Sequence, residues 1–75
     1  MGRHGVGYIT KDSTVTIDII AANLRNTIAG KEIAYSEWRR ADNKVGDLVC
    51  KMLDINIREL RRILQDVEQY QAEAE

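Results

Sequence analysis

The stretch that decides the fold is "CKMLDINIRELRRIL", residues 50–64. Its apolar residues recur at helical spacing, but its middle reads Asp54-Ile55-Asn56-Ile57. Asp and Asn are poor residues for a helix interior, because their side chains compete for backbone hydrogen bonds and favour turns. Either one helix passes straight through this stretch, or two helices meet there at a tight corner. The choice separates a coiled-coil-like rod from a compact domain.

The apolar pattern changes phase within this stretch. Before it, apolar residues at steps of three and four form one seam on a helix: Trp38, Ala41, Val45, Leu48 and Met52. Continued by the same steps, the seam reaches Ile55 and then fails at Glu59. A second stripe then begins: Ile57, Leu60, Leu64 and Val67. A change of phase indicates a stutter in one helix or a break between two.

Local chemistry favours the break. Asn56 is followed three residues later by Glu59, a spacing typical of a capping box at the start of a helix. Ser36 is the expected cap of the preceding helix. The sequence therefore predicts helices at about 36–53 and 57–72, joined by a turn at 54–56. Gly46 lies inside the first of them at a cost of about 1 kcal/mol relative to alanine, and it allows another backbone to come close.

The earlier segment "STVTIDIIAANLRNTIAG", residues 13–30, fits two patterns. Its first half alternates like a strand at 14–19, whereas its apolar residues taken together follow helical spacing. Ser13 or Thr14 can cap a helix and Gly30 can close it, so we favour a helix over about 15–29 and keep the strand as the alternative. The predicted fold class is all-α: a small three-helix domain over residues 13–75, preceded by a flexible glycine-rich tail, residues 1–12.

The segment Val49–Leu64 resembles the helix-turn-helix superfamily of DNA-binding proteins. The positions that carry the resemblance are the small Cys50 and the apolar Val49, Leu53, Ile55, Leu60 and Ile63. The family usually has glycine at the turn, and this chain has Asp54. The resemblance implies a sharp corner between the second and third helices, with the third helix lying in the major groove.

This resemblance, together with the polar residues of the third helix, predicts a small transcriptional regulator that reads double-stranded DNA. The expected base-reading residues are Asn56, Arg58, Arg61, Arg62 and Gln65, because Arg pairs with guanine, and Asn or Gln with adenine. The expected phosphate contacts are Arg39, Arg40 and Lys44. The expected homodimer contacts are Leu64, Val67 and Tyr70.

The competing hypothesis is a small helical homodimeric protein-interaction module, an adaptor or inhibitor that binds no DNA and could be encoded by a phage. Charge supports it: the net charge is −1, and residues 65–75 contain four acidic residues and no basic one. Amphipathic helices also show charges to water whatever their function.

Size and composition exclude several classes. A chain of 75 residues makes one small domain of marginal stability, and 44% hydrophobic residues are too many for intrinsic disorder. No apolar run approaches a membrane span and no signal peptide is evident, so we expect a cytoplasmic protein. A single cysteine, Cys50, and a single histidine, His4, cannot hold zinc. Cys50 lies among apolar residues and is expected to be a small buried side chain. We expect no enzyme, no cofactor and no metal.

Overall fold

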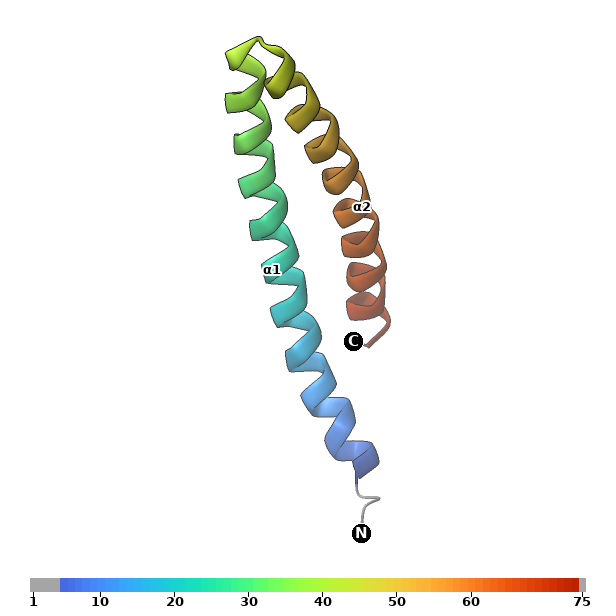
Figure 1. Ribbon diagram of the computed structural model, residues 1–75. Coiled ribbons are helices and arrows are strands. Elements are labelled where there is room, and N and C mark those ends of the chain that lie inside the picture. The colour runs from blue at the N-terminus through green and yellow to red at the C-terminus, as the bar shows by residue number, and fades with distance from the viewer. Residues whose placement is uncertain (1–4, 75) are drawn as a thin grey trace.

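The chain folds as an antiparallel helical hairpin. The structure, a computed structural model, describes the backbone of residues 5–74 and the side chains of residues 15–73. The described part contains two helices, α1 (Gly5–Ala41, 37 residues) and α2 (Lys44–Ala74, 31 residues). They run side by side from a tight turn, and the N-terminal part of α1 extends beyond the end of α2 (Figure 1). The molecule measures 59 × 21 × 14 Å, so it is a single layer of helices.

The turn consists of two residues with complementary roles. Asp42 has φ 51°, the left-handed conformation that commonly ends a helix and that Asp tolerates better than most residues. Asn43 begins α2 as its N-cap: its Oδ1 accepts a hydrogen bond from the backbone N–H of Gly46 at 2.7 Å. Its carbonyl accepts the first helical bond, from the N–H of Asp47 at 2.9 Å. The chain therefore reverses without leaving these backbone groups unpaired.

Gly46 allows the two helices to meet closely at this end. It is buried, and a Cβ placed on it would lie 2.6 Å from the backbone oxygen of Trp38. Any side chain there would push α1 and α2 apart. The expectation that this glycine admits another backbone is confirmed.

One apolar stripe on each helix forms the interface between them. On α2 the stripe consists of Cys50, Leu53, Ile57, Leu60, Leu64 and Val67, all buried or half-buried. On α1 it consists of Ile17, Ala21, Leu24, Ile28 and Tyr35, and the half-buried Lys31 occupies the position between the last two. Both run at steps of three and four, the 3.5-residue average of coiled-coil packing. We call these two rows together the inner stripe; its most buried members are Ala21, Ile28, Cys50, Leu53 and Ile57.

The prediction of a three-helix domain with a helix-turn-helix-like corner is wrong, although the all-α class is correct. α2 passes through Asp54–Asn56 without a break, because the inner stripe keeps its register across that segment. Asp54 pairs with Arg58 one turn later, at 2.9 Å, and stays helical. The fold that the helix-turn-helix resemblance implied is therefore absent; the chain turns at Asp42–Asn43 instead.

The predicted limits of the first helix are also wrong. Gly30 does not close a helix but lies inside α1, and Ser36 is no cap: its hydroxyl donates to the carbonyl of Glu32 at 3.2 Å, one turn back. The helix continues because the inner stripe of α1 runs past Ile28 to Tyr35. Residues 14–19 are helical, which removes the strand alternative. Of the predicted tail, residues 5–12 belong to α1 and residues 1–4 lie outside the described residues.

Candidate interaction surface

A second apolar row of α2 faces solvent. Val45, Leu48, Met52 and Ile55 are 59, 57, 55 and 56% exposed. They are the α2 part of the seam that the sequence analysis followed. The turn at Asp42–Asn43 separates them from Trp38 and Ala41, which lie on α1, so the predicted helix over 36–53 is wrong. At about 100° per residue, the four α2 residues lie roughly 150° around α2 from the inner stripe, on the side of α2 turned away from α1. We call these four residues the outer stripe. A helix with two apolar rows so arranged has the pattern of one that packs against two neighbours.

The outer stripe lies nearest to the side of the hairpin on which a hydrogen bond joins the two helices. Lys31 Nζ of α1 donates to Asn56 Oδ1 of α2 at 3.3 Å. Trp38 lies seven residues from Lys31, two turns along the same side of α1, and Ile63 lies seven residues from Asn56 in the same way. Trp38 is 41% exposed and Ile63 is 49% exposed. We call the outer stripe with Trp38 and Ile63 the apolar face.

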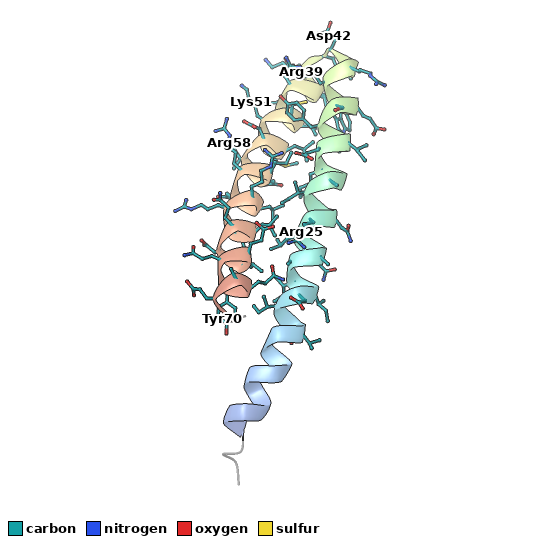
Figure 2. The ribbon with its side chains drawn as sticks, turned by 180° about the vertical axis from the view of Figure 1, so that it is seen from behind. Arg25, Arg39, Asp42, Lys51, Arg58 and Tyr70 are labelled. Atoms are coloured by element: carbon teal, nitrogen blue, oxygen red, sulfur yellow. The ribbon has the colours of Figure 1, made fainter. Side chains whose placement is uncertain are left out.

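The other side of the hairpin is charged. Arg25 pairs with Glu68 at 3.0 Å, and Arg61 pairs with Glu32. Figure 2 shows Arg25 between the helices, where it reaches α2. These side chains are about half exposed, so each pair contributes at most about 1 kcal/mol. The two ion pairs between the helices thus lie on one side of the hairpin, and the Lys31–Asn56 hydrogen bond lies on the other.

The predicted base-reading residues divide between the two sides. Asn56 lies on the Lys31 side, as an acceptor in a part-buried contact between the helices. The other four come together along α2, where they line a shallow depression of about 530 Å³. Its lining consists of Arg58, Arg61, Arg62, Leu64, Gln65 and Glu68. Figure 2 shows Arg58 on the side of α2 turned away from α1.

Carboxylates already engage two of these arginines. Arg58 pairs with Asp54 in its own helix, and Arg61 pairs with Glu32 across the hairpin. Glu68, which pairs with Arg25, adds a further negative charge to the depression. The proposed recognition helix also lacks its corner, since the segment is the middle of α2. Base reading remains a prediction, but the helix-turn-helix corner on which it was based is not present in α2.

The predicted phosphate contacts gather at the turn. Arg39 and Arg40 end α1 and Lys44 begins α2, and all three are exposed. Arg39 donates to the hydroxyl of Tyr35 at 3.1 Å, and its guanidinium carbon lies 6.0 Å from the centre of that ring. This part of the turn carries carboxylates as well as cations.

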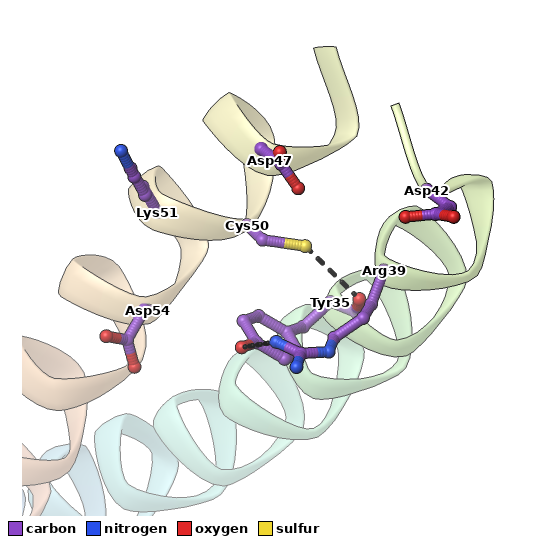
Figure 3. Close-up of a pocket in the computed structure, with 7 residues that line it drawn as sticks. All are labelled: Tyr35, Arg39, Asp42, Asp47, Cys50, Lys51 and Asp54. Carbon is purple, nitrogen blue, oxygen red and sulfur yellow. Dashed lines mark hydrogen bonds between the residues drawn. The ribbon is translucent and has the colours of Figure 1, made fainter. Parts of the chain in front are cut away.

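A hollow of about 380 Å³ lies beside the turn, and of the predicted phosphate contacts only Arg39 lines it (Figure 3). Its lining consists of Tyr35, Arg39, Asp42, Asp47, Cys50, Lys51 and Asp54. At its base, the thiol of Cys50 donates to the backbone oxygen of Tyr35 at 3.6 Å, and the residue is 8% exposed. Cys50 is therefore the small buried residue that the sequence predicted.

The predicted dimer contacts lie mainly inside the hairpin. Leu64 and Val67 belong to the inner stripe and are half-buried, and only Tyr70, 50% exposed, points to solvent. Gln71, one turn beyond Val67, donates to Asp18 of α1 at 2.6 Å, so this end of α2 already has a neighbour. Dimerisation itself stays a prediction. The side chains of the outer stripe are more exposed than those of Leu64 and Val67.

From the sequence, the four residues of the outer stripe are identified as a helical seam, but their exposure to solvent is not predicted. Ile55 is assigned to the end of that seam and, with Ile63, to the apolar positions of the helix-turn-helix resemblance. The missed signal was that α2 carries two rows at 3.5-residue spacing, one beginning at Val45 and one at Cys50. A hairpin of two helices can cover only one of them.

Comparisons with family models, curated proteins and solved structures found no match. Within the part of the chain that the structure describes, no helix is both long and apolar enough to span a membrane. Among those same residues, no group of three or more His, Cys, Asp or Glu side chains converges as a metal site would require.

Proposed function

We propose that the chain is a protein-interaction module, a helical hairpin whose apolar face packs against helices of another polypeptide. The observation that carries the proposal is the outer stripe, four large apolar side chains in a row that are each more than half exposed. Scattered exposed apolar residues are ordinary, whereas a contiguous row marks an interaction site. Helix-in-groove and helix-on-helix recognition use this 3–4 spacing.

The dimensions of the molecule support the same conclusion. Domains consist of at least two packed layers, and this hairpin is one layer 14 Å thick. Its radius of gyration is 17.5 Å, against about 11 Å for a compact domain of this length. Its accessible surface of 5871 Å² exceeds the roughly 4,700 Å² of a compact monomer of this mass. A second layer from another polypeptide would cover the apolar surface that the single layer leaves exposed.

Photo-crosslinking in the cells that naturally produce the protein tests the proposal. A photoreactive amino acid at Met52 samples the apolar face, and the same amino acid at Arg58, on the polar side of α2, is the matched control. We expect discrete crosslinked species from position 52 and none from position 58. Absence of any crosslink from position 52, with the protein present and helical, overturns the proposal.

DNA reading by α2 is the second and weaker proposal. Its support is the cluster of Arg58, Arg61 and Arg62 along one depression. Against it stand the carboxylates that pair with Arg58 and Arg61. If it is correct, the chain shifts double-stranded DNA, and the affinity falls steeply as salt rises because counterions are released. No shift at low salt eliminates this proposal and leaves the first untouched.

A further inference from the structure

We infer that the occupant of the outer stripe is a second copy of this chain, and that the two α2 helices pair antiparallel through Val45–Ile55 in a dimer of two hairpins. This inference rests on the proposed function, and it specifies the partner and the arrangement. It differs from the dimer predicted from the sequence, whose contacts lay toward the other end of α2. The register of the outer stripe, its flanking charges and the exposed area each support it.

The outer stripe is complementary to itself when reversed. In an antiparallel pair centred on Cys50, Leu48 of one copy lies opposite Met52 of the other, and Val45 opposite Ile55. All four positions are more than half exposed in the hairpin, so each contact buries new surface. A twofold interface requires this reciprocity, since the same patch serves both copies. The inner stripe remains inside each hairpin.

The charges next to the stripe favour the antiparallel arrangement. Glu59 continues the outer stripe one turn beyond Ile55 and is exposed. In the reversed register it lies about one turn beyond Val45 of the other copy, at the N-terminal end of α2, where Lys44 is exposed. A parallel pair in register would instead place Glu59 against Glu59, which is destabilising. Opposite charges thus select one direction, as they do in coiled coils.

The exposed area is sufficient for a dimer. The hairpin exposes about 1,200 Å² more than a compact monomer of its mass. A standard interface takes about 800 Å² from each partner. Part of the excess belongs to the N-terminal portion of α1 that extends beyond α2, so the dimer is expected to cover most of what remains (Figure 1).

Disulfide trapping of the purified chain reads out both the partner and the direction. In a Cys50→Ala background, Val45→Cys and Ile55→Cys are prepared separately and oxidised alone or mixed. The inference predicts a crosslinked dimer from the mixture and little from Val45→Cys alone. In the antiparallel pair the two copies of position 45 are about 15 Å apart along the helix, beyond the ~7 Å limit for a disulfide.

Other outcomes of the trapping experiment overturn the inference. A dimer formed by Val45→Cys alone indicates parallel pairing. If the mixture forms no disulfide and the chain sediments as a monomer at millimolar concentration, the partner at the outer stripe is not a second copy. If position 52 still crosslinks in cells to a different protein, the proposed function stands and only this inference fails. If neither experiment gives a product, both fail.

A charge-reversal series tests the register. Glu59→Lys is expected to raise the dimer dissociation constant about tenfold, because two symmetric pairs are lost and replaced by repulsion. Adding Lys44→Glu to the same chain is expected to restore most of the affinity. Glu73→Lys, the same charge change outside the overlap, is the control and should leave the constant unchanged. Equal effects of Glu59→Lys and Glu73→Lys, measured by sedimentation, contradict the register.

Discussion

Two short segments of this chain contain the same turn-forming residue types, and only one of them turns. At Asp42–Asn43 the backbone enters the left-handed region, and the Asn43 side chain caps the next helix. At Asp54–Asn56 the chain remains helical: Asp54 pairs with Arg58, and the amide oxygen of Asn56 accepts a bond from Lys31. The difference therefore does not lie in the Asp and Asn side chains themselves.

The neighbours of each segment explain the difference. Leu53 and Ile57 flank the second segment, and they are only 6 and 8% exposed in the inner stripe. A turn there would remove one of them from the interface at a cost of about 1.5–3 kcal/mol. The preference of Asp and Asn against helix interiors is only a few tenths to 0.7 kcal/mol per residue. Around the first segment, Trp38 and Val45 are 41 and 59% exposed, so turning there loses less burial.

The largest expected effect comes from proline in each segment. Ile55→Pro should lower the free energy of unfolding by about 3 kcal/mol or more, because proline inside a helix removes a hydrogen bond and clashes with the preceding turn. Lys44→Pro should change it by less than about 0.5 kcal/mol, because proline is favoured at the first helical position. Chemical denaturation followed by circular dichroism measures both. Equal tolerance of the two would show that residues 54–56 form a turn after all.

Alanine at two glycines is expected to act in opposite directions. Gly46→Ala should destabilise the hairpin by about 1–3 kcal/mol, because its Cβ would meet the Trp38 carbonyl at 2.6 Å. Gly30→Ala should stabilise it by about 0.5–1 kcal/mol, because nothing lies within 4 Å of that Cβ and alanine favours helix. Thermal unfolding of the two variants measures the pair. A neutral Gly46→Ala would contradict the close approach at the turn.

Much of the local structure was predictable from the sequence. Helical spacing predicted the all-α class, the apolar surroundings of Cys50 predicted its burial, and Gly46 predicted a close backbone approach. The number of helices was not predictable by the same reasoning, because α2 carries two apolar rows. Spacing identifies both rows but does not say which one finds a partner within the chain. Following the outer stripe made a change of phase at Ile55 look like a break.

The candidate site was less predictable than the fold class. That the arginines of α2 would be exposed followed from the pattern, but their carboxylate partners did not. Arg61 and Glu32 are 29 residues apart in sequence and meet only because the turn lies at Asp42–Asn43. Moving the turn to residues 54–56 changes every such pair. Contacts between the helices therefore depend on the position of the turn, which the turn-forming residues at 54–56 led the sequence analysis to predict wrongly.

Removing the amide from each segment gives a smaller effect. Asn43→Ala should lower the free energy of unfolding by about 1 kcal/mol, the usual loss for an N-cap. Asn56→Ala should lower it by less than about 0.5 kcal/mol, because its partner Lys31 can bond to water and alanine favours helix. Denaturant midpoints of both variants check this order. A larger loss at Asn56 would identify it as the cap of a separate helix.

Glycine in place of each aspartate gives the smallest expected effects, of opposite sign. Asp42→Gly removes the penalty for a left-handed residue, about 1–2 kcal/mol, but increases the freedom of the unfolded chain, so the net gain should be about 0.5 kcal/mol. Asp54→Gly removes the pair with Arg58 and places glycine inside a helix, for a net loss of about 0.5–1 kcal/mol. Melting temperatures measured under identical conditions resolve the sign. A loss at Asp42 comparable to the loss at Asp54 would mean that the Asp42 side chain, and not only its backbone conformation, stabilises the turn.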